Sequence, residues 1–212
     1  MLRRSFFITL VFGVLLATVL VSGCDLLGDD LTPSIGNVDV IGFEPHIQPI
    51  LDRQCASCHG GSRPRAGLSL EGWTQLIQGS EFGEVVIPFA SEDSRMIQKL
   101  KRVGDDTHPF DQGKDRLSED EVNLLTRWVD EGAIGPLGAV PFSNSINLAY
   151  IAHADEPYVS VLDMDAFVVV RRLDLTQHGF SERARVHHVA VEPDGAFWYA
   201  SVGSYRIGDL EG

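Results

Sequence analysis

The chain has 212 residues, of which 30 are acidic and 17 are Lys or Arg, giving a formal net charge of −13. Nucleic acid is not an expected partner of so acidic a surface, because phosphate backbones are bound through clusters of Lys and Arg. A basic partner protein would be attracted to it instead. The length allows one large domain or two small ones, and a change in composition along the chain favours two.

The N-terminus predicts export. Arg3 and Arg4 precede an apolar run from Phe6 to Val21 that is short for a membrane span. The run ends in LVSGC at Cys24, which resembles the signal of bacterial lipoproteins. This resemblance implies a signal peptide over residues 1–23, lipid on Cys24 and a membrane-anchored protein of the periplasm or cell envelope. An ordinary secretory peptide and an uncleaved anchor are the alternatives.

Removal of the signal peptide makes the chain more acidic. Arg3 and Arg4 are its only charged residues, so 15 Lys and Arg remain against 30 Asp and Glu, a formal charge of −15. Residues 24–40 contain acidic residues, Gly, Pro and Ser with little periodicity, and they predict a flexible tether. From Glu44 a helical pattern begins, which Pro49 should kink or shorten.

That helical pattern leads into Cys55-Ala56-Ser57-Cys58-His59, the attachment signature of c-type haem. Two thiols at this spacing can each add to one haem vinyl group, while the following imidazole binds the iron. A zinc site would need four ligands, and a thioredoxin-like redox pair would need a βαβ context. A disulfide is the remaining alternative. The motif predicts one covalent haem c held by Cys55, Cys58 and His59.

Several helices should follow the motif. A Gly-rich loop over residues 60–67 precedes a short helix near Trp73 to Gln78. Ser91 is the expected start of a helix that continues through Met96 to about Val103. Ser118 and Glu121 form a capping box before an apolar stripe that includes Val122, Leu125, Trp128 and Val129, and Gly132 ends that helix.

Residues 43–133 resemble a bacterial, planctomycete-type cytochrome c domain, which implies a haem-binding domain over residues 41–136. The resemblance rests on FEPHIQPILDRQCASCH up to His59, on Gly67 to Leu70, on the segment from Ser94 to Leu100, and on LSEDEVNLLTRWVDEGA at the end. It implies a small all-α fold around the haem. In that family a Met-Pro pair before the last helix presents the sixth iron ligand, whereas this chain has His108-Pro109 there.

His108 is therefore the favoured ligand on the second face of the iron, because imidazole is a competent axial ligand. Met96 is the alternative, although a methionine on an apolar helix face more often belongs to the core. A five-coordinate iron is also possible, and His46 is a weaker candidate. Loss of a thioether ligand would lower the reduction potential, since Met ligation raises it.

From residue 140 onward the pattern changes to short β-rich runs separated by turns. They cover residues 147–152, 158–162, 167–173, 186–191 and 197–202. Without intervening helices they predict antiparallel sheet, so the fold class is α+β. Residues 147–205 resemble one to two repeats of a YVTN-type β-propeller, which implies an incomplete propeller-like region over 140–212 as the front of a longer protein.

His153, His187 and His188 lie in this β region. The resemblance allows a metal site there, but single histidines before apolar strands are ordinary in such repeats, so none is expected.

The predicted function is electron transfer by an exported, lipid-anchored c-type cytochrome, with a redox protein and a membrane as partners. No nucleophile or acid–base pair marks an enzyme. Two alternatives remain. The chain could be the haem domain of a propeller-containing oxidoreductase, or a surface-displayed binding protein in which haem is ancillary.

Overall fold

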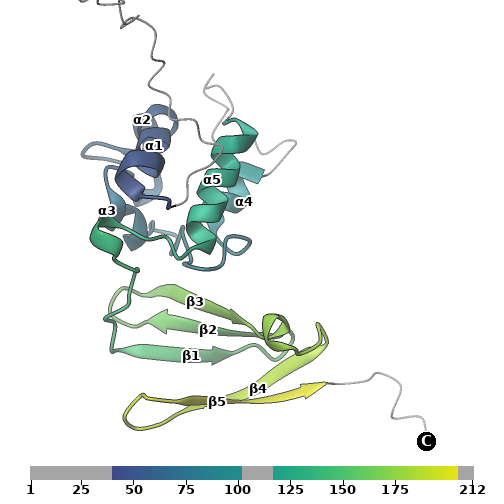
Figure 1. Ribbon diagram of the computed structural model, residues 1–212. Helices are drawn as coiled ribbons and strands as arrows, with labels where there is room; N and C mark the ends of the chain where they lie inside the picture. The colour runs from purple at the N-terminus through teal and green to yellow at the C-terminus, as the bar shows by residue number, and fades with distance from the viewer. Residues whose placement is uncertain (1–39, 102–116, 205–212) are drawn as a thin grey trace, which may run out of the picture. The chain divides into compact units, whose positions relative to one another are not determined.

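The computed structural model of the chain describes residues 40–101 and 117–204, all of which belong to one compact unit. Helices occupy the first part of this unit and antiparallel strands the second (Figure 1), as an α+β fold requires. The predicted signal peptide, the lipidated Cys24 and most of the predicted tether lie outside the described residues. Among the helices described, none is long and apolar enough to cross a bilayer.

Within the described residues, the helical part contains five α-helices. They are α1 (Gln48–Gln54), α2 (Ala56–His59), α3 (Trp73–Gln78), α4 (Arg95–Lys101) and α5 (Glu119–Asp130). A π-helical turn (Phe43–Ile47) precedes α1, and 3-10 turns occur at Arg65–Gly67 and Pro136–Gly138.

Pro49 has the expected effect on the first helix. It stands in the first turn of α1, where a missing backbone N–H costs no intrahelical hydrogen bond. The residues before it form the separate π-helical turn, whose start is fixed by His46: the backbone N–H of Gly42 donates to its Nδ1 at 2.9 Å. His46 is thereby engaged at the start of the helix.

The predicted capping box of α5 is present. The Ser118 side chain accepts from the N–H of Glu121 at 3.2 Å, and Glu121 Oε2 accepts from the N–H of Ser118 at 2.8 Å. Glu121 also forms an ion pair with Arg53 of the α1 helix. The buried side of α5 consists of Leu124, Leu125, Trp128 and Val129, while Val122 is half-buried.

Helix α4 begins later than the sequence predicts. Residues 91–93 form a turn, and the helix starts at Arg95. The cause is Ser94, which is fully buried and whose Oγ accepts from the N–H of Ile87 at 2.8 Å. This bond ties the residue before α4 to the preceding strand-like segment. Glu92 and Asp93 therefore lie in the turn before the helix.

One hydrophobic core holds the helical part together, with sixteen buried residues in a single cluster. Trp128 lies at its centre, with its ring 5.5 Å from that of Phe43 and its indole N–H donating to the carbonyl of Ile134 at 2.9 Å. The indole nitrogen of Trp128, its only polar side-chain atom, thus has the hydrogen-bond partner that burial requires.

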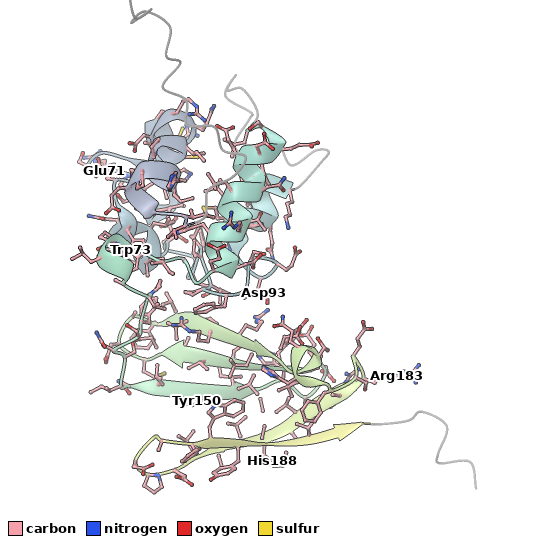
Figure 2. The ribbon with its side chains drawn as sticks, viewed as in Figure 1. Glu71, Trp73, Asp93, Tyr150, Arg183 and His188 are labelled. Carbon is pink, nitrogen blue, oxygen red and sulfur yellow. The ribbon has the colours of Figure 1, made fainter. Side chains whose placement is uncertain are left out.

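The chain leaves α5 under the ring of Trp73 (Figure 2). The indole N–H of Trp73 donates to the carbonyl of Ala133 at 2.8 Å. A Cβ at Gly135 would overlap that ring, and a Cβ at Gly132, where φ is 106°, would overlap the ring of Phe89. Glycine at both positions is a steric requirement of this exit.

Five strands form two antiparallel sheets. The first sheet has the order β1 (Leu148–Ala152), β2 (Tyr158–Asp163) and β3 (Val168–Asp174), and the second pairs β4 (Ala184–Val191) with β5 (Trp198–Ser204). Leu148 pairs with Asp163 across β1 and β2, and Val191 pairs with Trp198 across β4 and β5. The five predicted β runs are therefore all strands, and their antiparallel pairing agrees with the sequence.

Burial in the β part is divided between two small clusters. Val159, Leu175 and Val186 form one, and Val161, Val168 and Val170 form the other. The ring of Tyr150 stacks on that of Trp198 at 6.1 Å. Among the described strands the closed ring of blades that defines a propeller is not formed.

Candidate functional site

The CASCH motif forms a helical turn immediately after α1. Cys55 is the residue directly after α1, and its N–H donates to the carbonyl of Leu51 at 2.8 Å. The N–H groups of Cys58 and His59 then donate back to the carbonyl of Cys55 at 3.1 and 3.0 Å. This turn brings the two half-buried thiols and the imidazole together on one short stretch of chain.

His59 is held in place from both sides. Its side chain is buried, with the residue 8% exposed, and its Nδ1 lies 3.1 Å from the carbonyl oxygen of Arg65. Its own carbonyl accepts from the N–H of Leu70 at 2.7 Å. A backbone carbonyl at Nδ1 is the usual means of orienting a histidine that ligates a metal through Nε2.

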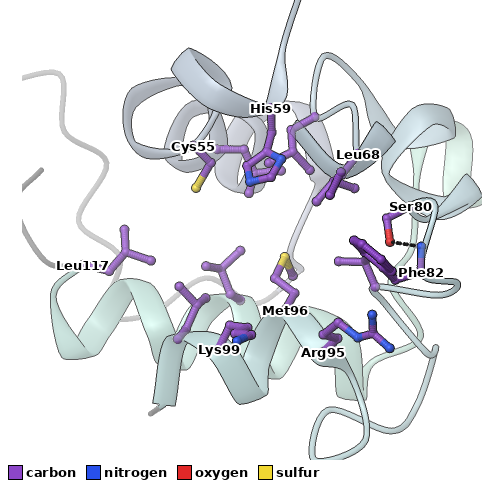
Figure 3. A pocket seen from close by; sticks show the side chains of 15 residues that line it. Cys55, His59, Leu68, Ser80, Phe82, Arg95, Met96, Lys99 and Leu117 are labelled. Carbon is purple, nitrogen blue, oxygen red and sulfur yellow. Dashed lines mark hydrogen bonds between the residues drawn. The ribbon is translucent and has the colours of Figure 1, made fainter. Parts of the chain in front are cut away.

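An apolar cavity of about 340 Å³ opens beside this turn, and Cys55 and His59 line it (Figure 3). The aliphatic side chains in its wall come from the helices and from the loop after the motif. They are Leu51, Leu68, Leu70, Val85, Leu100, Leu117 and Leu125. A concave, mostly apolar site of this size can bury a large flat ligand.

Met96 lies across the cavity from His59. Its N–H donates to the carbonyl of Val85 at 3.0 Å, and the adjacent Ile97 is fully buried in the core. With Ile97 anchored, the thioether of Met96 points into the cavity towards His59, as Figure 3 shows. One nitrogen donor and one sulfur donor therefore face each other.

Two cationic residues of α4 also line the cavity. Neither was predicted from the sequence as a site residue. Arg95 is exposed and Lys99 is half-buried, and both line the cavity one helical turn apart. Their signal in the sequence was the i, i+4 spacing on either side of Met96. Phe82 and Ser80, from a tight turn whose Ser80 N–H donates to Gly83 at 2.9 Å, were also not anticipated.

Of the other predicted site residues, Cys58 is half-buried and is not among the residues that line the cavity. His108 and Cys24 lie outside the described residues. Within the β part, Nε2 of His153 is 2.9 Å from the Oγ of Ser160, and Nδ1 of His188 is 3.5 Å from the Oγ of Ser201. Across the two described ranges, no three His, Cys, Asp or Glu side chains come together as a metal site.

Comparison with known proteins supports the helical part of this description. A family model described as planctomycete cytochrome C matches residues 55–108, about a quarter of the chain. This similarity supports a cytochrome c domain, and it implies haem c at the CASCH motif. Neither the curated proteins nor the solved structures contain a match to the chain.

The residues present fit haem c. Its attachment requires two thiols separated by two residues and followed by histidine, and Cys55, Cys58 and His59 supply them on one turn. Its macrocycle requires an apolar slot, and its iron requires N or S donors on opposite faces. The cavity supplies the slot, with His59 and Met96 on facing walls.

Proposed function

We propose that this chain is an exported c-type cytochrome that transfers electrons through one covalently bound haem. The observation that carries the proposal is the CASCH turn, which places Cys55 and His59 in the wall of an apolar cavity. The similarity of residues 55–108 to planctomycete cytochrome C supports it. A bound haem c supplies one-electron exchange between ferric and ferrous iron.

Each residue of the site then has a defined task. The thiols of Cys55 and Cys58 hold the group covalently, and Nε2 of His59 binds the iron while Nδ1 is oriented by the Arg65 carbonyl. The aliphatic wall excludes water, which limits the reorganisation that accompanies electron transfer and tunes the potential. The residues of the chain would hold the haem, orient the histidine that binds its iron and keep water away from it.

We assign the sixth iron ligand to Met96, with His108 as the alternative that the sequence favours. The support is the side chain of Met96, which enters the cavity opposite His59. Thioether ligation raises the potential relative to a second imidazole. The two assignments therefore predict potentials that differ in a known direction.

Lipid anchoring at Cys24 and a periplasmic or cell-envelope location complete the proposal. They are supported by the LVSGC sequence and by the export that haem attachment requires. The redox partner would carry a basic docking surface, because the exported chain has a formal charge of −15. The β part is proposed to be a section of a propeller, in keeping with its antiparallel hairpins.

The test is to produce the full chain in a host that matures c-type cytochromes and to measure covalent haem by the pyridine haemochrome assay. We expect one haem per chain, reducible by dithionite and lost in the Cys55→Ala, Cys58→Ala double variant. Cys24→Ala is the matched control, because it removes a thiol outside the haem motif and should keep the haem. Haem-free wild-type protein from this host would refute the proposal.

The ligand assignment is tested in the same preparation. Met96→Ala should convert the low-spin spectrum to high-spin, whereas His108→Ala should leave it unchanged. The reverse result would make His108 the ligand and Met96 part of the wall.

A further inference from the structure

The cavity carries a charge signature that iron ligation does not explain. Fifteen residues line it, and among these described residues the only Asp, Glu, Lys or Arg side chains are the two cations Arg95 and Lys99. Acidic side chains outnumber basic ones by 30 to 17 in the chain. An apolar slot lined by cations and by no described carboxylate suits an apolar ligand that carries an anionic group at its edge.

Arg95 lies on the side of the cavity where the anionic group of such a ligand would be placed. Figure 3 shows Cys55 and Arg95 on opposite sides of the cavity, with His59 and Met96 between them. The vinyl groups of haem and its two propionates project from opposite edges of the macrocycle. If the vinyl edge is bound to Cys55, the propionate edge faces the side on which Arg95 stands.

Arg95 is also without a hydrogen-bond or ion-pair partner among the described residues. Some other arginines of the chain are paired, for example Arg127 with Glu131 at 2.7 Å and Arg172 with Asp93 at 2.6 Å. On α4 itself, Lys101 is paired with Glu92 at 2.7 Å. A guanidinium that presents its donors beside a cavity, in a chain so rich in carboxylates, is available for an anion of the ligand.

We infer that Arg95 binds a haem propionate and thereby raises the reduction potential of the site. This inference rests on the proposed function. The planar fork of the guanidinium matches a carboxylate with two parallel hydrogen bonds. A cation beside the ring, and a propionate neutralised by it, disfavour the more positively charged ferric state.

The test uses the full-length holoprotein and three variants of α4. Arg95→Gln removes the charge at the cavity, and Arg95→Lys keeps the charge but not the fork. Lys101→Gln is the matched control, because it removes a cation from the same helix away from the cavity. The readouts are the midpoint potential, obtained by redox titration, and the propionate bending band in resonance Raman spectra.

Arg95→Gln should shift the redox equilibrium about tenfold towards the ferric state, which is about 59 mV for one electron. It should also move the propionate band. Arg95→Lys should keep most of the potential but also move the band. Lys101→Gln should change the equilibrium by less than about threefold, because Lys101 does not line the cavity and its charge is paired with Glu92, and it should leave the band in place.

An Arg95→Gln protein with the potential and propionate band of Lys101→Gln would overturn the inference while leaving the proposed function intact. Wild-type protein without haem would instead refute the proposed function and the inference with it. If Arg95→Gln is not loaded with haem, Arg95→Lys decides. A loaded Lys variant with a shifted band supports the propionate contact, and failure of both variants to load would assign Arg95 to folding and overturn it.

Discussion

The helical part and the β part bury their apolar residues in different ways. The helices share one cluster of sixteen buried residues, and this cluster forms the back of the cavity. The strands bury two separate groups of three. A continuous core is what keeps facing side chains at fixed positions, so the candidate site lies where the packing is continuous.

The two parts are not isolated from each other. Arg172 of β3 forms an ion pair with Asp93, in the turn just before α4, and the guanidinium of Arg171 lies 5.2 Å from the centre of the Phe89 ring. Burial lowers the pKa of Arg171, although it remains charged. These polar contacts differ in kind from the apolar core of the helices.

The largest effect is expected at Trp128. Trp128→Ala should destabilise the protein by about 3–5 kcal/mol, because it empties the centre of the helical core and leaves the Ile134 carbonyl without its donor. Urea unfolding measures the change. Phe197→Ala, also an aromatic truncation but at an exposed site, is the control and should stay within about 0.5 kcal/mol. Equal losses of unfolding free energy in these two variants would contradict the difference in packing between the helical part and the β part.

A buried residue of the β part should have a smaller effect. Val159→Ala removes two methyl groups from a fully buried position and should cost about 2 kcal/mol. The haem spectrum should not change, because Val159 belongs to a cluster outside the helical core. Unfolding followed by far-UV circular dichroism and by haem absorbance separates the two parts. Loss of the low-spin spectrum in this variant would show that the sheet supports the site.

The α5 cap tests a local contribution. Ser118→Ala should cost about 1 kcal/mol, because the N–H of Glu121 loses its acceptor at the helix start. Thermal unfolding of the holoprotein measures it. Ser57→Ala, at an exposed position within the haem motif, replaces a serine that caps no helix and should be nearly neutral.

The smallest effect is expected in the turn between β2 and β3. Hydrogen bonds from the Ser145 side chain and from the N–H groups of Ala166 and Asp165 hold the pKa of Asp163 below its usual 3.8. A lowered pKa in the folded state means that the stabilisation is present above about pH 4 and is lost as the pH falls through the lowered pKa.

The Asp163→Asn variant should therefore have a lower free energy of unfolding than the wild type at pH 7. Its free energy of unfolding should also fall less than that of the wild type between pH 7 and pH 3. Guanidinium unfolding at pH 7 and at pH 3 measures both. A wild-type protein whose stability falls no more steeply than that of the Asn variant would contradict this prediction.

Much of the local structure could be predicted because its causes are local. Spacing alone identified CASCH as a haem motif, and the capping box set the start of α5 at Glu119. The helix over Trp73–Gln78 and all five strands also agree with the sequence pattern. In each case the decisive side chains lie within a few residues of the structure that they specify.

Features set by distant contacts could not be predicted. The start of α4 is delayed by the bond from Ile87 to Ser94, seven residues away. The direction of Met96 follows from the burial of Ile97, which the apolar pattern alone could not distinguish from packing of Met96 in the core. The division of the strands into two sheets, and the position of Arg95 and Lys99 at the cavity, likewise depend on the assembled fold.

The contact between Gly135 and Trp73, where the chain leaves α5, limits the substitutions that this chain can accept. Gly135 accepts no side chain without moving an indole that is hydrogen-bonded to Ala133 and belongs to the border of the helical core. Trp73 and Gly135 are 62 positions apart in the numbering, yet a side chain at position 135 is excluded as long as the indole keeps its place. A substitution of Gly135 is therefore expected to persist only after a smaller residue has replaced Trp73, so the order in which the two positions can change is set by the contact.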